Sequence, residues 1–69
     1  MIEIFKTTVE SSGQAASILG LLHLHFPATD INFDLDDCDR ILRVKGEMFC
    51  PVTVIRILRD NGFECRALD

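Results

Sequence analysis

The chain has 69 residues, of which 48% are hydrophobic, and its formal net charge is −4. A chain of this length has material for one hydrophobic core, so we expect residues 1–69 to form a single domain. The excess of acids opposes binding to a phosphate backbone, and no apolar run approaches the roughly 18 residues that a membrane span needs. We therefore expect no nucleic-acid partner and no membrane insertion.

The start of the chain and its cysteines indicate where the protein works. Residues 1–6 (MIEIFK) carry an early acid and lack the long apolar stretch of a secretory signal. Three cysteines, Cys38, Cys50 and Cys65, cannot all pair within one chain. Because reduced thiols are usual in the cytoplasm, we expect a cytoplasmic protein with free cysteines.

The first half of the chain predicts a strand, a helix and a second strand. Residues 2–8 mix β-branched and aromatic residues, with apolar side chains on both faces of the expected strand. Residues 15–25 repeat apolar side chains at helical spacing, and Pro27 ends this helix. Residues 31–35 alternate apolar and polar side chains, which is typical of a half-buried strand.

The second half repeats this alternation of elements. The aspartate-rich residues 36–39 predict a hairpin turn, followed by a strand over residues 40–45. A second helix begins at Pro51 and ends before the Asn-Gly pair at 61–62, and residues 63–68 predict the last strand. The side chains expected to face inward in this half include Leu42, Val44, Val54, Ile55 and Leu58.

The resulting order, βαββαβ, predicts an α+β ferredoxin-like sandwich. Right-handed crossovers give a four-stranded antiparallel sheet with two helices on one face, which leaves the other face open. The turn after the first strand, the aspartate hairpin and the Asn-Gly turn are then expected at one end of the sheet.

Three segments carry a resemblance to a known family. Pro27 ends the first helix at the family's spacing, and residues 31–46 (INFDLDDCDRILRVKG) resemble its second hairpin. Residues 52–65 (VTVIRILRDNGFEC) resemble its ending of apolar helix, glycine, aromatic residue and strand. Nearly the whole chain thus resembles a heavy-metal-associated (HMA) domain, the module of copper chaperones and of the N-terminal tails of copper-pumping ATPases.

The resemblance implies where a metal would bind. Family members hold copper through a Cys-x-x-Cys pair in the first strand-to-helix turn, because Cu(I) selects thiolates and a helix N-terminus favours that form. In this chain the two cysteine positions fall on Ser11 and Gln14, and the methionine that commonly precedes them falls on Val9. Since neither Ser11 nor Gln14 supplies a thiolate, we expect no metal and no other cofactor here.

Ser11 and Gln14 suit a structural role instead. Ser-x-x-Gln is the capping-box pattern, in which the serine oxygen accepts from the amide three residues on and the glutamine reaches back. Such a cap stabilises a helix start by about 1 kcal/mol. The backbone amides there would also attract an anion, which the net negative charge opposes.

Phe63 stands where the resembling family commonly has an aromatic residue that shields the metal turn and touches the partner domain. We expect Phe63 to pack over Ser11 and Gln14, and we interpret these three residues as an interaction site. A second apolar patch for dimerisation or partner docking is expected from Ile2, Ile4, Ile41, Leu68 and Leu24.

The remaining reactive residues leave an alternative open. Cys50 precedes the second helix, where a thiol pKa is depressed, and Cys50 with His25 or His23 would supply ligands for Zn(II) or Cu(I). The plainer interpretation is a partly buried Cys50 and a solvent-facing His23. Cys65 is expected in the core and Cys38 at an exposed hairpin tip.

The aspartates of residues 34–39 lack the spacing, glycine and glutamate of a calcium-binding EF-hand loop, so they predict a solvated turn. Neither a phosphate-binding loop nor a nucleophile elbow is present, so we expect no enzyme.

The sequence therefore predicts a non-enzymatic cytoplasmic binding module with an HMA-like fold and no metal pair, which docks to a protein partner or to a second copy. The alternative is soft-metal binding or transport through Cys38, Cys50 or the histidines, in a dimer. A third candidate function, the binding of a small molecule at a dimer interface, is supported by analogy with the fold alone.

Overall fold

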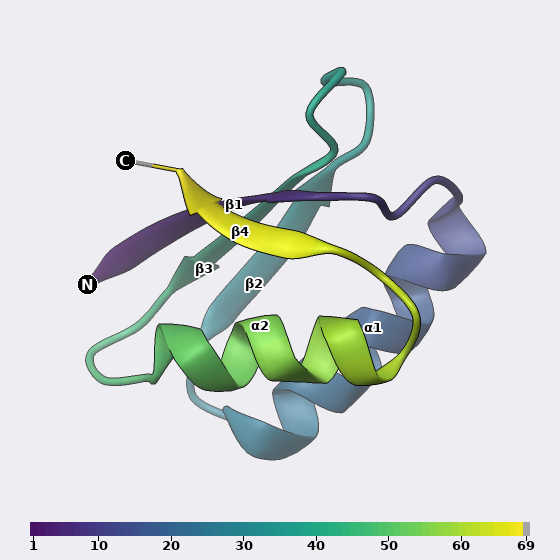
Figure 1. Ribbon diagram of the computed structural model, residues 1–69. Helices are drawn as coiled ribbons and strands as arrows, with labels where there is room; N and C mark the ends of the chain where they lie inside the picture. Colours follow the sequence, from purple (N-terminus) through teal and green to yellow (C-terminus); the bar gives the residue numbers. More distant parts are fainter. Residues whose placement is uncertain (69) are drawn as a thin grey trace.

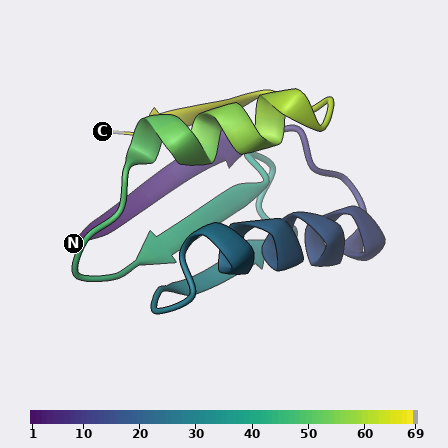
Figure 2. The same ribbon diagram turned by 90° about the horizontal axis from the view of Figure 1, so that it is seen from below.

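Four strands and two helices build the protein, whose computed structural model describes residues 1–68. The strands form one antiparallel sheet in the order β2-β3-β1-β4. Both helices cover the same face of this sheet, as Figures 1 and 2 show. The expected α+β ferredoxin-like fold is confirmed. The elements are β1 (Ile2–Thr7), α1 (Ser12–His25), β2 (Asp30–Asp34), β3 (Ile41–Lys45), α2 (Pro51–Asp60) and β4 (Cys65–Leu68).

The central strand β1 points its odd-numbered side chains at the helices. Phe5 and Val9, which follows the strand, have no solvent exposure, whereas Ile2 is 55% exposed. On the neighbouring strand β3, Leu42 and Val44 are fully buried, as predicted. Both faces of β1 carry apolar side chains, so the sequence did not show which face is buried. The position of the helices decides that the odd-numbered face is buried.

Each helix buries one stripe of apolar residues. The stripe of α1 is Ala15, Ile18 and Leu22, as expected from their spacing. The stripe of α2 consists of Val54, Ile57 and Leu58. The expectation that Ile55 completes this stripe was wrong: Ile55 is only partly buried, because positions 54, 57 and 58 share one helix face and position 55 lies at its border.

The ends of several elements differ from the predicted ones. Helix α1 begins at Ser12, three residues before the predicted apolar pattern, because Ser11 caps it there as the capping-box pattern predicts. Strand β4 begins at Cys65, two residues later than expected, because the Phe63 amide donates to the Leu58 carbonyl at 3.0 Å and completes the end of α2. The ends of β1, β2 and β3 differ from the predicted ones by a single residue.

The three turns expected at one end of the sheet do meet there (Figure 1). The Thr7 amide donates to the Asp39 carbonyl at 3.1 Å, which ties β1 to the hairpin between β2 and β3. The Thr8 amide donates to the Glu64 carbonyl at 3.2 Å, which ties β1 to the turn before β4. None of the helices described here, within residues 1–68, is long and apolar enough to cross a membrane.

Candidate functional site

The turn between β1 and α1 contains the predicted capping box. The Ser11 hydroxyl accepts from the Gln14 amide at 3.1 Å, and the Gln14 side-chain oxygen accepts from the Ser11 amide at 3.2 Å. The same Gln14 oxygen also accepts from the Glu10 amide at 3.0 Å. The side chains of Ser11 and Gln14 are therefore engaged in holding the helix start.

Phe63 lies in the turn between α2 and β4. Its side chain is partly buried and packs against the edge of the hydrophobic core, while Ser11 and Gln14 are exposed. The structure brings their two turns to the same end of the sheet (Figure 1). That Phe63 covers the cap directly stays a prediction.

Arg40 links two of the meeting turns, and sequence reasoning missed this role. Its guanidinium donates to the Glu10 carbonyl at 3.1 Å and to the Leu35 carbonyl at 3.2 Å. Its backbone has a φ of 49°, in the left-handed region that non-glycine residues rarely adopt. The Thr7 hydroxyl donates to the Arg40 carbonyl at 2.7 Å, which holds this conformation. An arginine at a hairpin end carries no local signal for the contact with Glu10, because that acceptor lies 30 residues away in another turn.

We refer to the hydrogen bonds from the Arg40 guanidinium to the Glu10 and Leu35 carbonyls as the Arg40 clamp, and substitution of Arg40 tests it. We expect Arg40→Ala to lower the free energy of unfolding by about 1–2 kcal/mol, because two charge-assisted hydrogen bonds are lost. Arg40→Gly loses the same bonds but tolerates the positive φ, so we expect it to be about 0.5–1 kcal/mol more stable than Arg40→Ala. Urea denaturation measures both values. A glycine variant less stable than the alanine variant would contradict the backbone argument.

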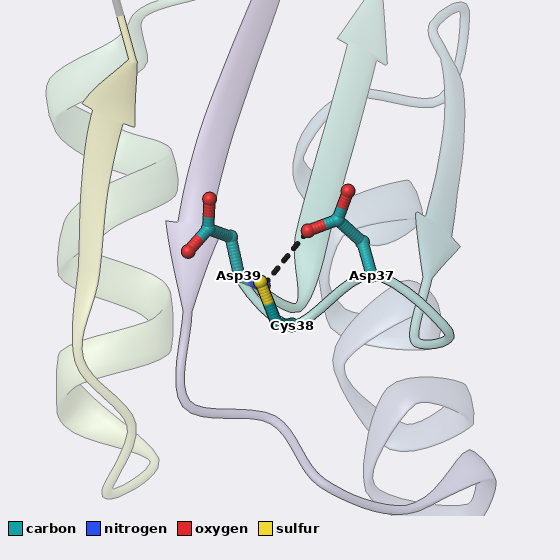
Figure 3. A group of neighbouring side chains, drawn as sticks. All are labelled: Asp37, Cys38 and Asp39. Carbon is teal, nitrogen blue, oxygen red and sulfur yellow. Dashed lines mark hydrogen bonds between the residues drawn. The ribbon is translucent and has the colours of Figure 1, made fainter.

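Asp37, Cys38 and Asp39 are the one group of three or more potential metal ligands that lie together within residues 1–68 (Figure 3). Their ligand atoms lie within 4.8 Å of one another. However, Asp37 accepts a hydrogen bond from the Asp39 amide at 2.8 Å, and the Asp39 carboxylate lies 3.4 Å from the ammonium group of Lys6. All three residues come from one turn, and the carboxylates already have partners, so these contacts suit the solvated turn predicted from the sequence.

The three thiols lie in different surroundings. Cys65 is buried in the core as predicted, and burial raises the pKa of its thiol to about 12. Cys38 is exposed, also as predicted. The expectation of a partly buried Cys50 was wrong: Cys50 is exposed, because it is the N-cap residue of α2 and lies outside the helix–sheet interface. The neighbouring Thr53, through its amide and hydroxyl, lowers the pKa of Cys50, and the Val52 amide adds to this effect.

The histidines offer little to a metal site with Cys50. His23 faces solvent, as expected. One ring nitrogen of His25 lies 3.0 Å from the Leu21 carbonyl of its own helix. Neither histidine belongs to a cluster of three potential ligands in the described part of the chain.

Burial of Cys65 makes stability depend on alkaline pH. Above about pH 8.5 the unfolded thiol releases its proton, whereas the folded thiol keeps it until about pH 12, so the free energy of unfolding falls as pH rises through this window. We expect a loss of about 2 kcal/mol at pH 10 relative to pH 8. Urea denaturation at both pH values checks it. The same loss in Cys65→Ala would show that another group is responsible.

The sheet face opposite the helices is uncovered and has a mixed character. Alternation with the buried residues assigns the outward positions of β1, β3 and β4. Ile4 lies opposite Leu68 on one side and Arg43 on the other, and Ile2 lies opposite Lys45. Leu24, expected in the same patch, lies in the helix layer on the other side of the sheet and is 79% exposed. The outward residues of these three strands are Ile2, Ile4, Lys6, Ile41, Arg43, Lys45, Arg66 and Leu68. The expectation that Ile41 belongs to the exposed patch was wrong: Ile41 is only 9% exposed, because it lies between Lys6 and Asp34 of the neighbouring strands.

A cavity of about 250 Å³ lies where β1 and the start of β4 meet the end of α2. Three of its lining residues are cations and one is an anion, although the chain as a whole carries a net charge of −4. The residues that line it are Lys6, Thr7, Thr8, Arg59, Glu64, Cys65 and Arg66. We refer to it as the β4 cavity.

Comparisons with protein-family models, with curated proteins and with solved structures found no match for this chain. The fold and the site geometry rest on the contacts of the chain's own residues. They define an α+β ferredoxin-like domain with an uncovered sheet face and a cluster of three hydrogen-bonded turns.

Proposed function

We propose that this chain is a non-enzymatic binding module that docks to a protein partner through its uncovered sheet face or through the turns that carry Ser11, Gln14 and Phe63. The observation that carries the proposal is the composition of the uncovered face. Ile2 leaves more than half of its surface in water at 55% exposure, and Ile4 and Leu68 form a cross-strand pair beside it. A partner that covers these side chains removes apolar surface from water.

Basic residues of β3 lie beside this apolar group and give it a charge preference, and the edge strand β2 adds one acid, Asp30, opposite Lys45. Arg43 and Lys45 of β3 lie directly opposite Ile4 and Ile2. Charged residues at the rim of an interface steer association and select among partners more than they add affinity. The proposed surface therefore has an apolar centre for affinity and a charged rim for selection.

The resemblance to HMA domains supports the proposal in two respects, the order of elements and the turn between β1 and α1. The order of elements is the one that the resemblance implies, and the cap formed by Ser11 and Gln14 occupies the turn where family members hold copper. We therefore propose a cytoplasmic HMA-like module in which a hydrogen-bonded cap replaces the metal site. Such a module recognises a partner without carrying an ion.

A Cu(I) titration against a chromophoric chelator at neutral pH tests the metal part of this proposal. We expect no stoichiometric binding by the monomeric protein, because the first turn offers no thiolate. We expect Ser11→Cys/Gln14→Cys to bind one Cu(I) tightly, because it restores the thiol pair at a helix start. Tight binding by the unmodified monomer would contradict the proposal.

Exposure of Cys50, together with its lowered pKa, favours a second candidate function, a soft-metal site between two copies. If this function holds, adding metal promotes association of two copies. Cys50→Ser or Cys38→Ser then abolishes metal binding and identifies the thiol that supplies the ligand. Size-exclusion profiles that coincide with and without metal would remove its support.

Docking through the sheet face is tested by two matched substitutions. Ile2→Asp places a charge on the uncovered face, and Leu24→Asp makes the same change at an exposed position of the helix layer. We expect a protein that co-purifies with the unmodified chain to be retained by Leu24→Asp and lost by Ile2→Asp, with at least a tenfold drop in affinity by calorimetry. Equal losses with both variants would contradict a specific face.

A further inference from the structure

We propose that the β4 cavity is a binding site for an oxyanion, a chemical group such as phosphate or carboxylate. The inference goes beyond the docking role proposed above and does not depend on it. It rests on which charges the fold gathers at this cavity, on the partners those charges already have, and on the size of the space.

The antiparallel register of β1 and β4 places two cations directly opposite one another. Lys6 pairs with Arg66 across the two strands, and both residues line the cavity. Like charges at directly opposed positions destabilise a sheet. This repulsion between Lys6 and Arg66 is present in the unbound protein. An anion bound between the two cations reduces it, which adds to the free energy of binding.

A third cation reaches the cavity from a different element. Arg59 lies in the last turn of α2 and lines the same space. Its charge acts on Cys65, another lining residue, where it opposes the effect of burial on the thiol pKa. Cations from a helix and from two strands thus line one cavity, and arginine guanidinium groups bind oxyanions through paired hydrogen bonds.

Within residues 1–68, anions leave these cations incompletely neutralised. In residues 1–68 the one ion pair joins Lys6 to Asp39, at 3.4 Å and with both side chains substantially exposed. Arg59 and Arg66 form no ion pair in that region, and Glu64 lines the cavity without coming within ion-pair distance of any of the three cations. Three positive charges against one negative give the lining a net charge of +2.

The hydroxyl groups and the volume suit a small ligand. The Thr7 hydroxyl is committed, because it donates to the Arg40 carbonyl. The Thr8 hydroxyl accepts from the Glu64 amide at 2.9 Å, which leaves its proton free to donate to an anion. A volume of about 250 Å³ is several times the roughly 30 Å³ of a water molecule and below the range of drug-sized pockets, so a small oxyanion fits.

Two-dimensional NMR titration of the full chain with inorganic phosphate tests the site. Ionic strength is held at about 0.1 M with sodium chloride, so that charges farther than about 10 Å from the ligand are largely screened. We expect saturable shifts of the Thr8, Cys65 and Arg66 amides. A second arm uses a blocked peptide of three glutamates, which offers carboxylates in place of phosphate. Binding of phosphate identifies a free anion as the ligand, and binding of the peptide alone identifies carboxylates of a protein.

Matched charge variants locate the site. Arg59→Gln and Arg66→Gln are each expected to weaken binding of the active probe about tenfold, because each removes a charge-assisted hydrogen bond. Arg56→Gln removes the same charge from the same helix as Arg59 but outside the cavity lining, and we expect less than a twofold effect. The dispersion of each spectrum reports whether the variant is folded.

Two results would overturn the proposal. The first is the absence of saturable shifts with both probes. The second is equal weakening by the cavity variants and by Arg56→Gln, which would show diffuse attraction to the positive charges of the chain and no defined site.

Discussion

The position of β1 between β3 and β4 is the constraint on which the rest of the structure depends. β1 hydrogen-bonds to both neighbours, so its register fixes which side chains of the sheet face the helices and which remain uncovered. Phe5 falls opposite Leu42 and both are buried. The next position brings Lys6 opposite Arg66, which creates the cationic side of the β4 cavity. The end of the same strand gathers the three turns through the Thr7 and Thr8 amides.

The turn between β1 and α1 is ordered by side-chain hydrogen bonds. Ser11 and Gln14 satisfy amides that a helix start otherwise leaves unpaired, and Gln14 accepts from two of them. Arg40 adds a link from the hairpin to the Glu10 carbonyl of the same turn. These bonds are individually modest, but together they order the segment without an ion and leave its polar groups satisfied. No buried side-chain nitrogen or oxygen within residues 1–68 lacks a partner.

Opposite charges are distributed unevenly over the molecule. The chain is acidic overall, yet Lys6, Arg43, Lys45 and Arg66 all lie on the uncovered sheet face, where they outnumber the acids Asp30 and Asp34 of β2. A net charge describes long-range attraction and repulsion, whereas a ligand at the surface responds to the groups within a Debye length. A negatively charged chain can therefore present a surface that attracts an acidic partner or a small anion.

Features that depend on neighbouring residues could be predicted from the sequence. The capping box of Ser11 and Gln14, the alternation of Leu42 and Val44, and the core position of Cys65 all follow from spacings of two to four residues. The order of elements and the known handedness of crossovers then determine the fold. The errors at Ile55 and Cys50 concern residues at the border of a packed face, where spacing alone does not decide burial.

Features that depend on register were decided only by the tertiary structure. The bond from Arg40 to Glu10 joins residues 30 apart in sequence, and Lys6 meets Arg66 only because β4 returns beside β1. Side-chain spacing along one segment carries no information on which residue of a distant strand lies opposite it. The sequence by itself therefore determined the fold and the helix cap, because local geometry specifies them. The Arg40 clamp, the β4 cavity and the character of the uncovered face required the pairing of strands across the whole chain.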